Sequence, residues 1–90
     1  MDRVERAKLA ILDLVIDDAS VARLTARSGS AVGCEVVATK EGYYAFADAV
    51  TGLGLRAELH FGDKIVVSKS EPVYLYEITI YVPEDWRERQ

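Results

Sequence analysis

The sequence contains a single cysteine, Cys34, and a single histidine, His60. One thiol can form no disulfide within the chain and can build no thiolate metal cluster. A nucleophilic cysteine needs a histidine partner, and no motif links these two residues. We therefore interpret Cys34 as a small buried apolar residue and expect no catalytic residue, no metal and no other cofactor.

Asparagine is absent, and Gln90 is the only glutamine in the 90 residues. Methionine also occurs only once. Depletion of thermolabile side chains, in a chain with many Ala, Val, Arg and Glu residues, is typical of thermophilic proteins. The composition predicts a thermophilic source.

Long apolar runs are missing too, because no segment approaches the roughly 18–20 apolar residues of a membrane-spanning helix. The first residues mix acidic and basic side chains and lack the pattern of a secretory signal. Half of the residues are hydrophobic and 29% are charged, which is a globular balance. We expect a soluble cytoplasmic protein with a single domain, residues 1–90, because a chain of this length can bury only one core.

A basic stripe is also lacking. The formal net charge is −4, and acidic and basic residues are interspersed along the whole chain. Non-specific binding to duplex nucleic acid has no electrostatic basis in such a pattern. Binding to nucleic acid is therefore the minority interpretation.

Residues 2–27 are predicted to be helical, in two segments. In the first segment, apolar residues recur at the three- and four-residue spacing of a helix; they are Val4, Ala7, Ile11, Leu14 and Val15. Leu9, Leu12 and Ile16 widen this apolar stripe and leave a narrow polar arc. We expect the first helix to carry more apolar surface than one sheet can cover.

The second helical segment is predicted over residues 21–27, after possible N-cap residues at 17–20. Arg27 in the last turn suits the helix dipole, and Gly29 occupies the position of a left-handed C-terminal residue. The glycine- and serine-rich segment SGSAVGC, residues 28–34, would then lead from a helix into a strand. A phosphate-binding loop needs the opposite order, with a helix N-terminus after the glycines, so we interpret the segment as a helix stop.

The remaining chain predicts a strand over 31–39, a helix over 40–52, strands over 55–61, 64–69 and 73–82, and a short tail over 83–90. A hairpin turning at residues 40–42 is the alternative to the second helix. Gly62-Asp63 is typical of a two-residue hairpin turn. The order α-β-α-β-β-β predicts an α+β two-layer sandwich, in which a four-stranded mixed or antiparallel sheet carries the helices mainly on one face. The first and second of these strands would be joined by a βαβ crossover.

Few polar residues suggest a site. Asp13, Asp17 and Asp18 form the one carboxylate cluster, which we interpret as a solvated face because no further metal ligands follow at a recognisable spacing. His60 alternates with the inward residues Leu59 and Phe61, so it should lie on the surface. Neither pattern identifies a catalytic centre.

The leading hypothesis is a non-enzymatic binding module that forms a homo-oligomer, a dimer or larger, and that could also bind another protein. Apolar residues of the predicted strands fall on the sheet face opposite the helices, and Trp86 in the tail should pack against a neighbouring element or a partner subunit. The candidate interface residues are Val37, Val66, Val73, Leu75, Tyr81 and Trp86.

Two alternatives remain open. Exposed tyrosines beside basic residues could stack the bases of single-stranded nucleic acid; the candidate contacts are Tyr44, Arg56, Lys64, Lys69 and Tyr81. Against this, Tyr74 and Tyr76 share a face with Ile78 and belong to the core. Residues 21–29 also resemble the first helix and turn of a winged helix-turn-helix regulator, although a basic recognition helix does not follow.

Overall fold

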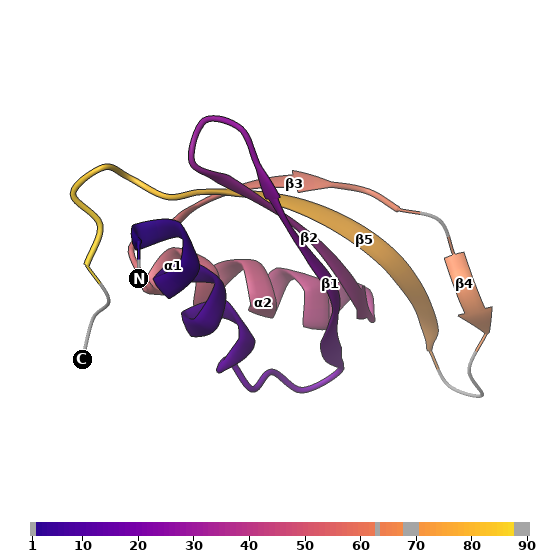
Figure 1. Ribbon diagram of the computed structural model, residues 1–90. Helices are drawn as coiled ribbons and strands as arrows, with labels where there is room; N and C mark the ends of the chain where they lie inside the picture. Colours follow the sequence, from indigo (N-terminus) through magenta and orange to yellow (C-terminus); the bar gives the residue numbers. More distant parts are fainter. Residues whose placement is uncertain (1, 63, 68–70, 88–90) are drawn as a thin grey trace.

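The computed structural model describes residues 2–62, 64–67 and 71–87. In these residues the elements are α1 (Arg3–Leu12), β1 (Ala19–Arg27), β2 (Ala31–Ala38), α2 (Lys40–Gly52), β3 (Arg56–His60), β4 (Lys64–Val67) and β5 (Pro72–Tyr81). Both helices lie on the same face of one sheet (Figure 1). The predicted fold class, a small α+β protein with its helices on one face, is confirmed.

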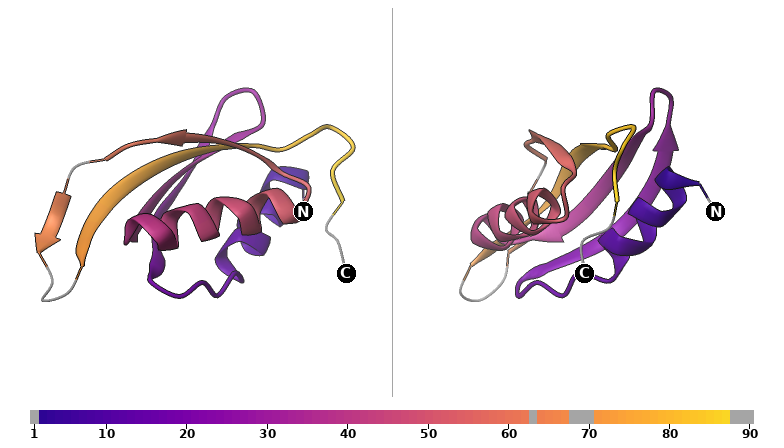
Figure 2. Two further views of the ribbon diagram at one scale, coloured as in Figure 1. Left: turned by 180° about the vertical axis from the view of Figure 1, so that it is seen from behind. Right: turned by 90° about the vertical axis from the view of Figure 1, so that its left-hand side faces the viewer.

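The sheet is antiparallel throughout, with the strand order β1-β2-β5-β3. The strand β5 is the longest and lies between β2 and β3, so the βαβ crossover from β2 through α2 to β3 spans an intervening strand. The two helices lie side by side beneath the sheet, with α1 near β1 and α2 near β3 (Figure 2).

Residues 19–27 form the edge strand β1, so the helix predicted over 21–27 is wrong. Its pairing with β2 shifts between Val21 and Arg23, which marks a β-bulge. Because of the bulge, the core-facing residues Val21 and Leu24 are three positions apart, a spacing that imitates a helix in the sequence. The first helix of a helix-turn-helix is therefore replaced by a strand.

The segment after β1 is a hairpin turn rather than a helix stop. Arg27 pairs with Ala31, and the three residues between them reverse the chain. Gly29 has a φ of 74° and Ser30 a φ of 60°. The left-handed conformation predicted at Gly29 is therefore present, but it belongs to a hairpin turn between two strands and not to the end of a helix. The turn leads into β2, and hence no helix N-terminus follows the glycine.

The strand β4 continues in the direction of β3, so the hairpin predicted at Gly62-Asp63 is wrong. His60 pairs with Glu77 of β5, and Lys64 pairs with Tyr74 of the same strand, further along in the same sense. A Cβ atom at Gly62 would overlap the carbonyl oxygen of Leu75. The two strands thus form one interrupted strand along β5, and the chain reverses between β4 and β5.

The helix α2 confirms the prediction over residues 40–52 and excludes the alternative hairpin. The hydroxyl of Thr39 caps the N-terminus by accepting a 3.0 Å hydrogen bond from the amide of Gly42. Tyr43, Phe46 and Val50 recur at helical spacing and are buried against the sheet. In the described residues, no helix is both long and apolar enough to cross a membrane.

The C-terminal tail returns to the helical layer. Trp86 is 5% exposed, and its indole Nε1 donates a 2.8 Å hydrogen bond to the carbonyl oxygen of Leu53 at the end of α2. The guanidinium carbon of Arg6 on α1 lies 5.9 Å from the centre of the indole ring. The prediction that Trp86 packs against a neighbouring element is confirmed, and this burial within its own chain removes it from the accessible surface.

Candidate functional site

The sheet face opposite the helices, here called the open face, carries four of the candidate interface residues. Val37, Val73, Leu75 and Tyr81 are all half-buried there. Val37 pairs directly with Leu75, and Val73 lies nearby on the same face, so these three form a small apolar area. Tyr81 lies at the other end of β5, and the side chain of Val66 is outside the described part of the chain.

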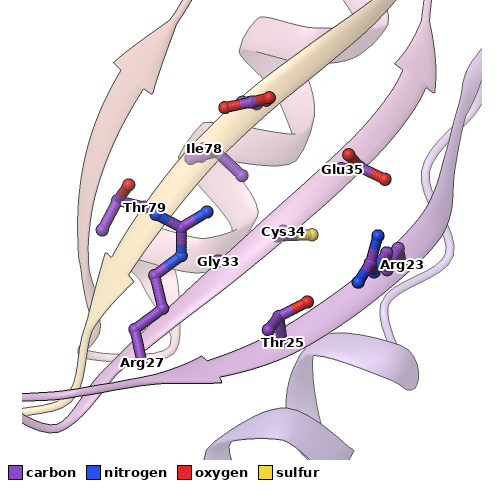
Figure 3. Close-up of a pocket in the computed structure, with 9 residues that line it drawn as sticks. Arg23, Thr25, Arg27, Gly33, Cys34, Glu35, Ile78 and Thr79 are labelled. Atoms are coloured by element: carbon purple, nitrogen blue, oxygen red, sulfur yellow. The ribbon is translucent and has the colours of Figure 1, made fainter.

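The rest of the open face is polar. Register places Arg23, Glu35, Glu77 and His60 in one row across the four strands, with the two carboxylates directly opposite each other. A shallow recess of about 170 Å³ lies between Arg23 and Thr79, and the side chain of Arg27 crosses above Gly33 within it (Figure 3). A dry contact between two such faces would desolvate these charges, so the open face is a poor interface outside its small apolar area.

The candidate nucleic-acid contacts do not form one surface. Tyr44 is exposed on α2, on the helical side of the sheet, whereas Tyr81 lies on the open face. Arg56 packs over Tyr81, with its guanidinium carbon 5.2 Å from the ring centre. Lys69 and the side chain of Lys64 lie outside the described part of the chain. The structure therefore separates the two tyrosines on which this hypothesis depends.

The residues considered for catalysis are also apart. Cys34 is buried on the core face of β2, where burial and then repulsion from Glu35 raise the pKa of its thiol from 9.0 to about 12. His60 projects from the open face, with its Nε2 3.3 Å from a carboxylate oxygen of Glu58 and 3.3 Å from the hydroxyl of Thr79. The sheet thus lies between the thiol and the imidazole.

The aspartates after α1 are exposed, in keeping with a solvated face. Asp13 caps the C-terminus of α1, and Asp18 has a φ of 61° in the loop to β1. Across the described ranges, no group of three or more His, Cys, Asp or Glu side chains is placed to hold a metal ion.

An exposed apolar area lies on and after α1. Leu9 is 49% exposed, Leu12 is 55% exposed and Val15 is 92% exposed; we call these three residues the α1 patch. A groove of about 370 Å³ adjoins the patch, and its lining includes Leu14, Ile16, Val21 and Phe46. The narrow polar arc of this helix predicts surplus apolar surface, but no pattern in the sequence identifies these three residues as a site.

A second exposed area lies beside the N-terminus of α2. Phe61, predicted to face inward, is instead 76% exposed. It lines a recess of about 240 Å³ together with Lys40, Gly62, Tyr74 and Tyr76; we call this the aromatic recess. Nothing in the sequence pattern indicated it, because its residues come together only through the interruption between β3 and β4.

Comparisons with models of protein families, with curated proteins and with solved structures find no match to this chain. Its function must therefore be argued from its own surfaces.

Proposed function

We propose that the protein is a non-enzymatic association module that forms a homodimer through the α1 patch. The observation that carries the proposal is the exposure of Leu9, Leu12 and Val15 on one short segment. Water-exposed apolar areas of this kind, when contiguous, are typical of interaction sites. The adjoining groove extends the same area toward β1 and α2.

The charges beside the patch favour a second copy of the chain as the partner. Arg6 and Asp13 are seven residues apart, which places them on the same flank of α1 beside Leu9. If two α1 helices pack antiparallel about a two-fold axis, Arg6 of each copy faces Asp13 of the other. The opposed helix dipoles favour the same arrangement.

The expected dimer is weak. Complete burial of a leucine or valine side chain contributes about 1.5–3 kcal/mol, so the remaining exposed parts of the patch contribute about 6–12 kcal/mol over two copies. Association costs about 4–15 kcal/mol in lost translational and rotational freedom. Contacts within the groove are therefore needed for a tight dimer, and the measurement must extend to millimolar protein.

The direct test is sedimentation equilibrium of the full chain from micromolar to millimolar concentration. We expect a monomer–dimer equilibrium that the double variant Leu9→Gln/Leu12→Gln abolishes, because both side chains are accessible and glutamine preserves helix propensity. Phe61→Gln is the matched control, since it removes another exposed apolar side chain and should leave dimerisation unchanged. A monomeric wild-type chain, or a double variant that still dimerises, would contradict the proposal.

The antiparallel arrangement has its own test by charge reversal. Arg6→Glu and Asp13→Arg should each weaken the dimer, and the combined variant should restore it, because the pair is re-formed with opposite signs. Each new charge suits the helix dipole at its end of α1. Because Arg6→Glu also removes the contact of Arg6 with Trp86, urea unfolding of each variant must accompany the sedimentation measurement. If the combined variant did not recover dimerisation, the antiparallel arrangement would be rejected. The result for Leu9→Gln/Leu12→Gln would still test whether the α1 patch is the interface.

A further inference from the structure

The aromatic recess exists because the sheet is longer than the helix beneath it. The strand β4 and the N-terminal part of β5 extend beyond the N-terminal end of α2 (Figures 1 and 2). Phe61 and Tyr74 therefore border a region that the helix does not cover. Gly62 permits close approach of this segment to β5, since a side chain there would overlap the carbonyl of Leu75.

Two of the lining residues, Tyr74 and Tyr76, belong to a cluster of contacting aromatic rings. Tyr76 is buried and stacks on Tyr43, with ring centres 3.9 Å apart and an interplanar angle of 1°. Tyr74 is inclined at 47° to Tyr76, with ring centres 5.5 Å apart. The hydroxyl of Tyr43 donates a 2.9 Å hydrogen bond to the carbonyl oxygen of Glu77, which holds this stack against β5. A ligand would therefore meet preformed ring surfaces, which lowers the entropy cost of binding.

The recess has the size for one or two fused rings. Its volume is about 240 Å³, and an apolar cavity of about 150 Å³ already accommodates benzene. A flat ring can contact the exposed ring of Phe61 and the side of Tyr74 at the same time. Aromatic pairs of this kind gain energy beyond the area that they bury.

Lys40 gives the recess a positive charge. It is exposed, and it makes no ion pair with any side chain in the described ranges. The other lining residues that the structure describes are uncharged. The recess should therefore attract a negative group on the ring and repel a positive one.

We propose that the aromatic recess binds a small planar aromatic anion, such as a free aromatic carboxylate. Its ring lies against Phe61 and Tyr74, and its carboxylate faces the ammonium group of Lys40. A nucleic-acid strand has the same ring and charge chemistry. However, the described lining contains one cation and the chain has a net charge of −4, which provides too little phosphate neutralisation. This proposal does not depend on the α1 patch.

The test is a titration of the ¹⁵N-labelled full chain, followed by amide chemical shifts. The probes are 2-naphthoate, the neutral 2-naphthalenemethanol and the cationic 2-naphthylmethylammonium ion. We expect saturable shifts at the amides of Phe61, Gly62 and Tyr74, with affinity falling from anion to neutral compound to cation. Equal affinity for the three probes, or no saturable shift at these amides with millimolar probe, would overturn the proposal.

Two variants measure separately the contributions of the aromatic ring and of the positive charge to binding. Phe61→Ala should weaken naphthoate binding by about fivefold or more, as expected for loss of an aromatic contact. Lys40→Gln should remove most of the preference for the anion over the neutral compound. Leu9→Gln, a change in the α1 patch, should leave both affinities unchanged. The proposal is rejected if Phe61→Ala or Lys40→Gln leaves the binding of the probes unchanged, or if Leu9→Gln abolishes it. It is also rejected if a thymidine oligonucleotide, followed by the same amide shifts, binds more tightly than thymidine monophosphate.

Discussion

Single side chains connect the helical layer to the sheet, and Tyr43 does so most directly. Its hydroxyl donates to the carbonyl oxygen of Glu77 on β5 and accepts a 3.0 Å hydrogen bond from the amide of His60 on β3. Burial raises the pKa of this hydroxyl from 10.0, against an opposing effect of the hydrogen bond from His60. Tyr43 thus remains protonated and able to donate throughout the neutral range.

Because the thiol of Cys34 is buried, we expect the protein to lose stability at alkaline pH. Its pKa rises from 9.0 to about 12 on folding, so above pH 9 the unfolded chain releases a proton that the folded chain keeps. The free energy of unfolding should therefore fall as the pH rises, by up to about 1.4 kcal/mol per pH unit for this group. Tyr43 and Tyr76, whose pKa values are also raised, act in the same direction.

Urea unfolding between pH 8 and about pH 10.5 measures this slope. Cys34→Ala should lower stability at pH 8 because it leaves a small cavity. It should also make the pH dependence shallower, so its difference from the wild type should shrink as the pH rises. An unchanged slope in this variant would show that the thiol is not the titrating group.

At the scale of elements, the two helices could be predicted from the sequence and the strand β1 could not. Thr39 and the spacing of Tyr43, Phe46 and Val50 give α2 a cap and an apolar face that only a helix satisfies. The bulge in β1 moves Val21 and Leu24 three positions apart, and sequence periodicity alone cannot distinguish that spacing from a helix. Bulges depend on pairing with a neighbouring strand, which a local pattern does not contain.

The edge strands explain why association is expected through a helix. The edge strand β1 carries a bulge, Arg23 and Arg27, and the β3 edge carries Arg56 and the interruption at Gly62. Charged side chains and bulges on edge strands hinder pairing with another sheet. Strand-to-strand dimerisation is thereby disfavoured, whereas the α1 patch carries no such protection.

The interruption between β3 and β4 predicts a strict requirement for glycine at position 62. A methyl group there would overlap the backbone carbonyl of Leu75, so Gly62→Ala should destabilise the protein by about 1–3 kcal/mol through forced backbone movement. Gly52→Ala is the control, because nothing lies within 4 Å of its added Cβ and alanine favours a helix. Thermal unfolding of both variants measures the difference, and equal melting temperatures would contradict the close contact at Gly62.

For the molecule as a whole, composition and periodicity predicted the fold class and the excess apolar surface of α1. The aromatic recess could not be predicted, because it depends on how far β4 and β5 extend past α2. The open face also differs from expectation. Its apolar residues Val37 and Leu75 occupy a small area beside the charged row that contains Glu35 and Glu77. The relative lengths of the packed helices and strands determine which surfaces stay uncovered. These relative lengths cannot be deduced from a single sequence.

The tail completes the helical layer through Trp86, which joins the C-terminal segment to α2 and lies against Arg6 of α1. Trp86→Ala should lower the free energy of unfolding by about 3–5 kcal/mol, because it empties a buried site of large volume. Trp86→Phe keeps most of the ring and loses the hydrogen bond to Leu53, so its cost should be about 1 kcal/mol. Urea unfolding of the two variants measures both changes, and sedimentation tests whether dimerisation follows. Because the indole is buried within its own chain, Trp86→Phe should dimerise as the wild type does. If Trp86→Ala were as stable as the wild type, the tail would contribute nothing to the packing of the two helices.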